Sequence, residues 1–330
     1  EQKAACEEIN AAIDSGLQTN FLLKGVTGSG KTEVYMQAAA RAISKGKTVI
    51  MLLPEIALTK QITERFIGRF GKESCAILHS HLTGRERFDE WSRVRSGEAK
   101  IVIGARMAVF APLENIGLII LDEEHESTYK SDMTPKYETV DIAFKRLMHY
   151  SGVLLLGSAT PSVVSYQRAK EGIYKLIEMN TRYNAVELPE MSIVDMRQEL
   201  RKGNRSIFSD KLYQSMEKHL ESGQQVILFL NRRGYSSSIS CKDCGNTLMC
   251  PDCGISLTYH KKENAAVCHY CGRHFDIPKE CPECSSKFIK FIGVGTEQVE
   301  EFVKKEFKDY ETERFDLDTA KNSREVSAIL

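Results

Sequence analysis

The stretch GVTGSGKT, from Gly25 to Thr32, decides the fold of this chain. It satisfies the pattern G-x-x-x-x-G-K-[ST], comes directly after the apolar run NFLLKG (20–25) and precedes a helical stretch. In such a loop, backbone N–H groups surround a phosphate, the lysine reaches the β- and γ-phosphate oxygens, and the last hydroxyl faces Mg²⁺. The sequence therefore predicts an ATP–Mg²⁺ site formed by Gly25, Val26, Thr27, Gly28, Ser29, Gly30, Lys31 and Thr32.

The acidic string LIILDEEH (118–125) supplies the second half of a nucleotide-hydrolysing site. Asp122 is predicted to hold the Mg²⁺ shell, and Glu123 to orient and polarise the attacking water. His125 belongs to the same string and is assigned to the nucleotide site. Lys31, Asp122 and Glu123 are thus the predicted catalytic residues.

Apolar runs alternate with amphipathic helical stretches over residues 1–180 and predict a doubly wound α/β lobe. Continuous Val/Ile/Leu runs separated by helices indicate a parallel sheet covered on both faces, with ligands at the carboxyl ends of its strands. The runs are NFLLKG (20–25), KTVIMLLP (47–54), SCAILHS (74–80), AKIVIGA (99–105), GLIILDEE (117–124) and GVLLLGSAT (152–160).

The second half of the chain is predicted to hold a linker and a second lobe. Residues 181–207 are polar and irregular, which is typical of a linker. The second lobe is expected at 208–235 and 292–330, with a helix at 210–223 and a strand, QQVILFL, at 224–230. A cysteine-rich module at 236–291 interrupts it.

Composition sets limits on the partners and the surroundings of the chain. Forty-five Lys and Arg balance forty-five Asp and Glu, so contacts to a nucleic acid must be local rather than made by a global basic field. No apolar run is long enough to span a bilayer, so no membrane partner is expected. The chain begins with Glu and stops inside a helical pattern, from which we expect both ends to be cut from a longer protein.

Eight of the ten cysteines form four C-x-x-C pairs, which is typical of metal binding in a reducing cytosol. Four thiolates satisfy one tetrahedral Zn²⁺, so the pairs predict two closed zinc sites. The runs ISLTYH (255–260) and AAVCH (265–269) flank a polar turn and predict a hairpin. That hairpin favours a nested pairing, with Cys250, Cys253, Cys268 and Cys271 in one site and Cys241, Cys244, Cys281 and Cys284 in the other. A sequential pairing is the alternative.

The near-balanced charge of the cysteine module favours duplex separation, protein contact or lobe support over tight DNA binding. Cys6 and Cys75 are expected to be buried thiols. Trp91, within the helical RERFDEWSRV, is expected to serve packing.

Beyond these motifs the sequence resembles superfamily 2 DNA helicases, and most closely the bacterial primosomal replication-restart helicases. The strings that carry the resemblance run in order over nearly the whole chain: GVTGSGKTEVY, PEIALT, IVIGARMAVFAPL, DEEHESTYK, GSATPS, LFLNRRGY, IGVGTE and the eight-cysteine block. The resemblance implies two RecA-like α/β lobes with the two-zinc module inserted in the second, and the same nested pairing of cysteines.

The resemblance also implies roles for individual residues. Gln2 is placed like a glutamine that reads adenine, and Ser158 and Thr160 of GSATPS resemble the string that links the ATP site to lobe movement. Single-stranded DNA contacts are expected at Pro54, Thr59, Arg106, Tyr129, Lys130, Lys136 and Tyr137. The two tyrosines lie in STYKSDMTPKY (127–137), where they could stack on bases while the lysines meet phosphates. A solvated surface loop is the alternative.

Several positions depart from the family pattern. Ala105 and Met107 stand where Thr and Ser are usual, which puts a hydroxyl-to-phosphate contact in doubt, and Val140 stands where Arg is common. The strings that carry an arginine finger lie beyond the chain, which predicts slow hydrolysis. The resemblance also implies a domain that recognises a DNA 3′ end, which is expected to lie outside this sequence.

Taken together, the sequence predicts an ATP-dependent 3′–5′ DNA helicase that acts on single-stranded and forked DNA to restart replication. Primosome proteins and single-strand-binding proteins are the partners that the resemblance implies, in the bacterial cytoplasm near the nucleoid. The alternatives are a duplex translocase that does not unwind, and a zinc-module scaffold for primosome proteins.

Overall fold

The computed structural model describes residues 1–54, 60–80, 82–183, 189–204, 206–230, 238–241, 243–260, 264–292 and 296–315. The chain divides into two compact units, Glu1–Pro189 and Glu190–Leu330. Residues 196–201, within the stretch that the sequence marks as linker, form a helix of the second unit.

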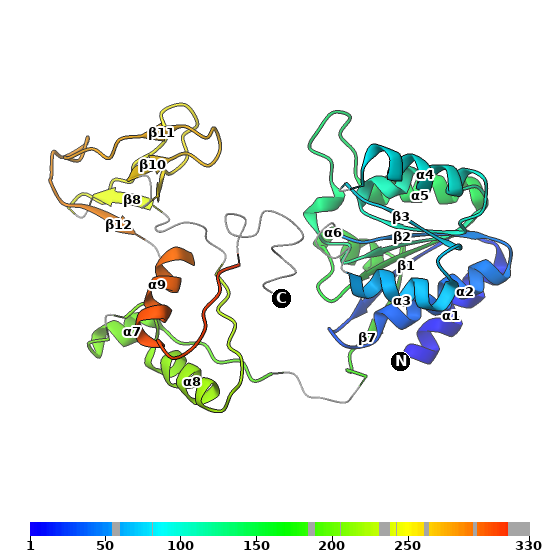
Figure 1. Ribbon diagram of the computed structural model, residues 1–330, viewed down its shortest axis with the longest axis horizontal. Coiled ribbons are helices and arrows are strands. Elements are labelled where there is room, and N and C mark those ends of the chain that lie inside the picture. Colours follow the sequence, from blue (N-terminus) through cyan, green and yellow to red (C-terminus); the bar gives the residue numbers. More distant parts are fainter. Residues whose placement is uncertain are drawn as a thin grey trace. The chain divides into compact units, whose positions relative to one another are not determined.

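The first unit is built on a seven-stranded parallel sheet with the strand order β3-β4-β2-β5-β6-β1-β7 (Figure 1). All six apolar runs form strands as predicted. The seventh strand was not predicted, because KLIEM is short and leaves polar residues exposed at the sheet edge. The strands are β1 Thr19–Gly25, β2 Thr48–Leu52, β3 Cys75–Leu78, β4 Ile101–Gly104, β5 Ile116–Asp122, β6 Val153–Ser158 and β7 Lys175–Met179.

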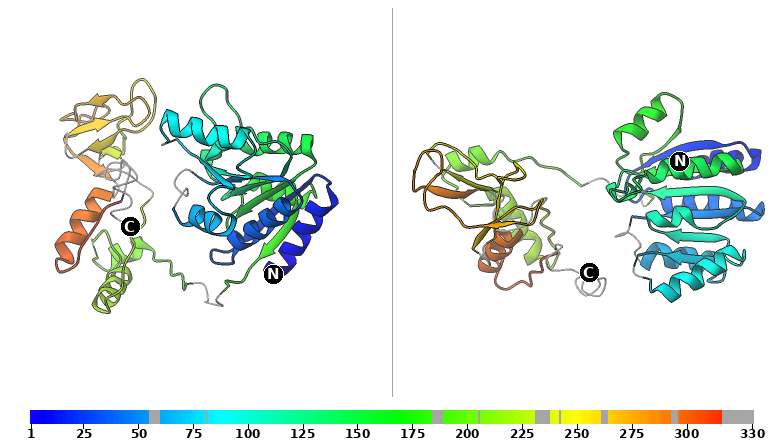
Figure 2. Two further views of the ribbon diagram at one scale, coloured as in Figure 1. Left: turned by 45° about the vertical axis from the view of Figure 1, so that its right-hand side comes forward. Right: turned by 90° about the horizontal axis from the view of Figure 1, so that it is seen from above.

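Helices cover both faces of this sheet (Figure 2) because successive strand residues point to opposite sides. Phe21 and Leu23 pack with helices α1, α2 and α3, whereas Leu22 packs with the helices of the other face. The first face carries α1 Gln2–Ser15, α2 Lys31–Ser44 and α3 Lys60–Phe70; the second carries α4 Gly84–Arg95, the 3₁₀ turn η2 Arg106–Phe110, α5 Thr139–Tyr150 and α6 Val163–Lys170.

The register of the sheet brings the carboxyl ends of its strands to one edge. Lys24 pairs with Ser158, and Asp122 pairs with Gly157. The phosphate loop after β1, the acidic string after β5 and the GSATPS string after β6 therefore meet at that edge.

The second unit holds the helices α7 Met196–Arg201, α8 Asp210–Glu221 and α9 Thr296–Glu306, and α8 and α9 contribute to a small core. Helix α8 confirms the expected helix, and its N-cap Ser209 accepts from the backbone N–H of Leu212. The buried residues are Phe208, Met216, Val299, Val303 and Phe307.

The strand expected at 224–230 is not a strand in this structure. Its side chains alternate as a strand's do: Val226, Leu228 and Leu230 pack on the core, while Ile227 and Phe229 are 91% and 88% exposed. No described residue pairs with this segment, and an extended segment becomes part of a sheet only when a neighbour satisfies its backbone groups. The pattern therefore predicted which side chains are covered, but the predicted strand is wrong.

The cysteine module forms two small antiparallel sheets. Strands β8 Ser238–Cys241 and β12 Ile289–Ile292 pair with each other, so the apolar start of FIGVGTE closes the module. Strands β9 Thr258–His260 and β10 Ala265–Val267 form the predicted hairpin, and β11 His274–Phe275 extends it.

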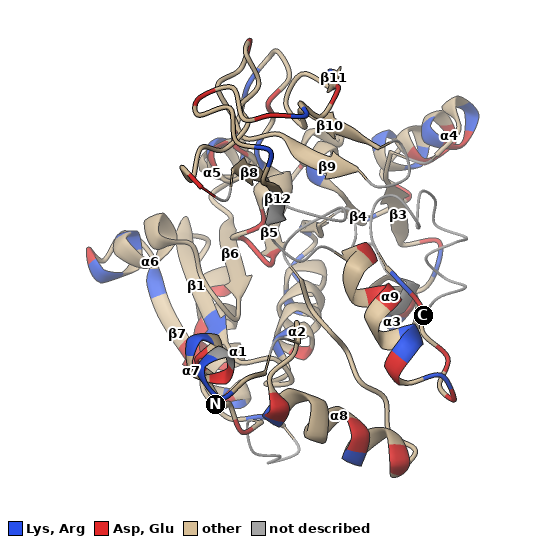
Figure 3. Ribbon diagram, turned by 90° about the vertical axis from the view of Figure 1, so that its left-hand side faces the viewer, with Lys and Arg blue, Asp and Glu red and all other residues tan. Residues whose placement is uncertain are grey.

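Charged residues lie mainly on helices and loops, while the strands of the large sheet are largely uncharged (Figure 3). None of the described helices is long and apolar enough to cross a membrane.

Candidate functional site

The phosphate loop folds as the sequence predicts because two of its glycines adopt positive φ. Gly28 and Gly30 have φ of 81° and 89°, a region that L side chains rarely adopt. The loop closes with the backbone N–H of Ser29 donating to the carbonyl of Val26, and α2 begins directly afterwards at Lys31. The first N–H groups of that helix have no partners within the helix, so they are available to a phosphate.

Lys31 and Gln2 flank this loop. The Lys31 ammonium donates to the carbonyl oxygen of Gly25 at 2.7 Å, so it lies over the turn rather than in solvent. Gln2 Nε2 donates to the carbonyl oxygen of Ser29 at 3.0 Å. A Cβ added to Gly30 would lie 1.7 Å from Gln2 Nε2, so a side chain there would displace the glutamine. Gln2 thus lies at the phosphate loop, and its reading of adenine stays a prediction.

Asp122 lies against the helix that follows the phosphate loop. Tyr35 Oη donates to Asp122 Oδ1 at 2.8 Å, and both residues are buried. Tyr35 was missed by the sequence analysis, although it follows Lys31 by one helical turn and therefore shares its face of α2. Gly157 leaves room for this contact, since a Cβ there would lie 1.8 Å from Tyr35 Oη.

The electrostatics of Asp122 reflect its burial and its neighbours. Burial raises the pKa of Asp122, and the Glu123 charge adds to that effect. The Tyr35 hydrogen bond and the Lys31 charge lower the pKa and so favour the ionised form. Lys31 and Asp122 thus belong to one site, and a divalent cation beside the carboxylate would favour ionisation further.

Glu123, His125, Ser158 and Thr160 form a connected group at the same edge. Glu123 is half-exposed and has a φ of 46°, and its Oε2 lies 3.6 Å from His125 Nδ1. His125 Nδ1 also shares a hydrogen bond of 2.8 Å with Ser158 Oγ. That hydroxyl accepts from the backbone N–H of Thr160 at 2.9 Å. The acidic string and GSATPS are therefore physically linked.

Glu124 is a structural carboxylate that the sequence analysis did not assign. It is buried and accepts from the Ser162 backbone N–H at 2.7 Å and from Ser165 Oγ at 2.8 Å. These contacts fix the start of helix α6 beside β5. Its neighbour Asp122 points instead to Tyr35 of helix α2.

The residues predicted to contact DNA differ in how exposed their side chains are. Tyr129 cannot stack on a base as predicted, because its side chain is 3% exposed. Its hydroxyl lies 3.0 Å from the carbonyl oxygen of Leu52 and 2.7 Å from that of Asp122, so it joins the ends of β2 and β5. The sequence could not separate this tyrosine from its loop neighbours, because burial depends on the tertiary fold.

The rest of the 127–137 loop is more open. Lys136 is exposed, while the ammonium of Lys130 pairs with Glu138 at 3.0 Å. Tyr137 is half-buried with its ring under the Arg106 guanidinium, 5.8 Å away, and Arg106 also donates to the carbonyl oxygen of Lys130. Pro54 is buried at the end of β2, and Thr59 lies outside the described residues.

The eight module cysteines gather into the nested clusters that the hairpin predicts, not into sequential ones. In each cluster the four sulfur atoms all lie within 4.8 Å of one another. The members are Cys241, Cys244, Cys281 and Cys284 in one cluster, and Cys250, Cys253, Cys268 and Cys271 in the other.

Sulfur separations in both clusters fit a tetrahedral zinc ion. A Zn–S bond of about 2.3 Å gives sulfur–sulfur edges of about 3.8 Å. The Cys241–Cys284 and Cys250–Cys271 separations are 3.6 and 3.9 Å. Backbone N–H groups at Cys244 lower the pKa of Cys241 to about 6, whereas burial and neighbouring cysteines raise that of Cys253 to about 12. Four thiolates this close together repel one another, so all four can be ionised only when a cation is bound between them.

Comparisons with known proteins agree with the α/β unit and with the cysteine module as described above. Residues 2–169 match the DEAD/DEAH box helicase family, and residues 250–274 match the Cys-rich region domain of the PriA DNA helicase. The chain is 49% identical over 319 residues to the replication restart protein PriA of Bacillus subtilis (strain 168), covering 97% of this chain and 40% of the relative. It is 44% identical over 338 residues to that of Synechocystis, covering 100% of this chain and 40% of the relative.

A solved structure of RecG bound to a three-way DNA junction is 25% identical. The match covers 62% of this chain and 28% of the RecG chain, and its TM-score is 0.41. The chain spans 40% of the length of the two PriA relatives.

Proposed function

The chain belongs to the DEAD/DEAH box helicase family, and from that premise we propose that it is the ATP-driven motor of a replication-restart DNA helicase. The observation that carries the proposal is the joining of two motifs by one helix. Lys31 begins α2 at the phosphate loop, and Tyr35 of the same helix hydrogen-bonds Asp122. This contact supports a single site in which Lys31 would bind phosphate and Asp122 would hold magnesium.

The proposed mechanism divides the work among these residues. The N–H groups at the start of α2 and the Lys31 ammonium would hold the β- and γ-phosphates of ATP, and the Thr32 hydroxyl and Asp122 would hold magnesium. Magnesium supplies charge neutralisation on the transferred phosphoryl group when bound. Glu123, which is half-exposed beside them, would orient the attacking water.

We propose that the change from bound ATP to its products is passed on through the two hydrogen-bonded strings, the acidic string and GSATPS. The hydrogen bonds that join His125, Ser158 and Thr160 connect the acidic string to GSATPS, which resembles a coupling string. A movement of the Glu123 side chain would act on His125, which lies 3.6 Å away, and through His125 on Ser158. We propose 3′–5′ movement on one strand of forked DNA, by resemblance.

The cysteine module is proposed to hold two structural zinc ions, one in each four-sulfur cluster. All four positions of each tetrahedron would be filled by sulfur, so the ions would have no open site for chemistry. The module would then support duplex separation or contact with primosome and single-strand-binding proteins. We place this work in the bacterial cytoplasm, at the nucleoid.

The test compares phosphate release and unwinding with single-stranded, duplex and forked DNA. The unmodified chain should bind ATP, and its hydrolysis of ATP should be stimulated by single-stranded DNA. Lys31→Ala should lose binding and turnover, whereas Glu123→Gln should bind ATP without hydrolysing it. A wild-type rate in Glu123→Gln would remove that residue from the mechanism. ATP turnover without strand displacement would favour the translocase, and no nucleotide binding at all would favour the scaffold.

A further inference from the structure

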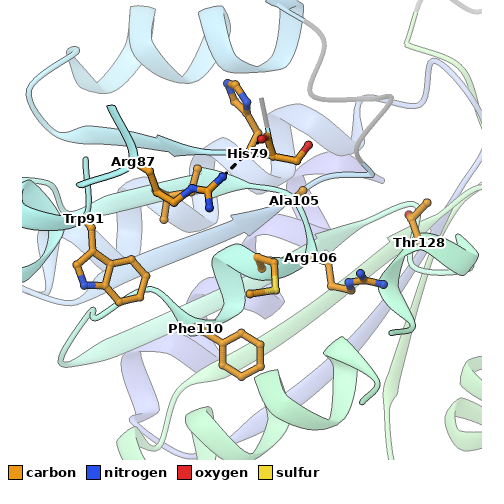
Figure 4. A pocket seen from close by; sticks show the side chains of 10 residues that line it. His79, Arg87, Trp91, Ala105, Arg106, Phe110 and Thr128 are labelled. Atoms are coloured by element: carbon orange, nitrogen blue, oxygen red, sulfur yellow. Dashed lines mark hydrogen bonds between the residues drawn. The ribbon is translucent and has the colours of Figure 1, made fainter. Parts of the chain in front are cut away.

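An open cavity of about 410 Å³ lies beyond the carboxyl ends of β3 and β4, away from the phosphate loop. Its walls come from the end of β3, helix α4 and the turn η2 (Figure 4). This volume is in the range of pockets that hold small organic groups. The residues that matter here are Arg87, Trp91, Arg106, Met107 and Phe110.

The apolar wall of this cavity is exposed rather than packed away. Trp91 is 38% exposed, Phe110 is 41% exposed and Met107 is 63% exposed. Trp91, which was expected to serve packing, also lines this cavity. Phe110 is held in place by Tyr137, whose ring meets it edge-on with centroids 5.2 Å apart. The cavity thus presents an indole and a supported phenyl ring to a ligand.

The charged side chains that line the cavity, Arg87 and Arg106, are positive. In Figure 4, Arg87 of α4 lies above Trp91, and Arg106 of η2 extends toward Thr128. No Asp or Glu is among the described lining residues. Arg87 donates to the carbonyl oxygen of Ser80 at 3.5 Å, and within the described residues neither arginine forms an ion pair with a carboxylate. Two guanidinium groups over an apolar cavity complement an anionic group attached to a flat apolar one.

We propose that this cavity receives one unpaired base of single-stranded DNA, stacked against Trp91 and Phe110, with the adjoining phosphates held by Arg87 and Arg106. Every base has a flat apolar face, so such a pocket tolerates any sequence, as a motor requires. The proposal rests on the proposed function, because it adds a base-binding subsite to the expected contact of Arg106 with the strand.

The position of the cavity is compatible with ATP in the phosphate loop. Strands β2, β5 and β6 separate β4 from β1 in the sheet. At about 4.8 Å per strand, the two sites lie about 19 Å apart along the sheet edge, so base and nucleotide do not compete for space.

Trp91 is the only tryptophan of the 330 residues, so tryptophan fluorescence, excited where tyrosine does not absorb, reports on this cavity. The probes are a short oligo-dT and an oligonucleotide of the same length that lacks bases. We expect oligo-dT to quench the fluorescence strongly with saturation, and the abasic strand to bind through phosphates with little quenching.

Matched variants separate the stacking contact from general effects. Trp91→Ala should raise the Kd for oligo-dT about 5- to 100-fold, the effect of losing one stacked base. Trp91→Phe should recover most of the affinity because it retains a ring. Phe88→Ala is the control, since Phe88 lies on the same helix, is 70% exposed and does not line the cavity. Arg87→Gln should reduce the salt slope of binding by about 0.7, the effect of one lost phosphate contact.

The outcomes distinguish this proposal from the function on which it rests. If oligo-dT binds without quenching, and Trp91→Ala binds as tightly as Phe88→Ala, the base subsite is wrong while DNA binding stands. If the unmodified chain binds no oligonucleotide, the proposed function fails and the subsite with it. If an acidic peptide with apolar residues quenches Trp91 where oligo-dT does not, the cavity is a protein-docking site and the proposal is overturned.

Discussion

The α/β unit and the cysteine module hold their functional residues in place by different means. In the α/β unit, strands buried on both faces fix the carboxyl edge of the sheet, and hydrogen bonds such as Tyr35–Asp122 set the side chains. The module has a small described core of Ile239, Cys250, Leu257, Ala266 and Cys268, two of which are cluster members. Its shape therefore depends on what the sulfur atoms bind.

The difference shows what each region requires from its surroundings. A large apolar core contributes enough free energy to hold a partly buried carboxylate before any ligand arrives. A small domain without such a core usually needs a metal or a disulfide. We therefore expect the α/β unit to keep its fold without ligands and the module to lose its fold without metal.

Metal removal should have the largest effect. A structural zinc ion contributes about 10–16 kcal/mol of apparent binding free energy, which is comparable with the whole stability of a domain. Treating the reduced chain with a strong chelator should make residues 238–292 sensitive to protease while ATP-analogue binding persists. Cys250→Ser should act similarly, and Cys6→Ser, at a buried thiol of the α/β unit, serves as the control. A protease-resistant module without metal would contradict the comparison.

Gly157→Ala should disrupt the buried contact between Tyr35 and Asp122. The new methyl group would lie 1.8 Å from Tyr35 Oη, so Tyr35 must move away from Asp122. Overpacking costs about 1–3 kcal/mol, and loss of the hydrogen bond adds to it. Urea unfolding measures the loss of stability, and Mg·ATP affinity measures the effect of the lost hydrogen bond on Asp122. Adding Tyr35→Phe should recover part of the loss, and a fully additive double variant would show that the two positions do not interact.

Tyr35→Phe alone should have a smaller effect, visible in pH dependence. The Tyr35 hydrogen bond lowers the pKa of Asp122, so its removal raises that pKa. The carboxylate must be ionised to hold magnesium; the acid limb of the Mg·ATP binding profile should therefore move to higher pH. Stability should fall by about 1.5–3 kcal/mol. Tyr129→Phe makes the same chemical change beside backbone carbonyls, and an equal shift in that variant would contradict the assignment.

The smallest effect is expected at the surface of the module. Arg273 and Asp252 form an ion pair of 2.6 Å, with side chains that are 64% and 44% exposed. Exposed pairs contribute about 0–1 kcal/mol. Arg273→Ala should leave the zinc content and the midpoint of metal release nearly unchanged. A large loss of zinc would mean that the surface of the module, and not only its sulfur clusters, determines its fold.

Much of the α/β unit could be predicted from periodicity and motif alone. Six of its strands were evident, because a buried parallel strand needs a continuous apolar run. Strand β7 was not, because an edge strand needs fewer apolar residues. The nested cysteine clusters were predictable because the hairpin at 255–269 brings two pairs together. The strand expected at 224–230 failed because alternation reports burial, whereas a sheet requires a partner.

The sequence by itself determined the chemistry: a phosphate loop that only glycine can turn, an acidic string at the end of an apolar strand, and cysteine pairs spaced for metal. Tertiary structure alone decided which side chains those motifs meet. It placed Tyr35 on Asp122, buried Tyr129 between two strand ends, and left Trp91 exposed beside a cavity. The physical reason is that spacing along the chain fixes local geometry, whereas contacts between distant residues depend on how the whole sheet packs.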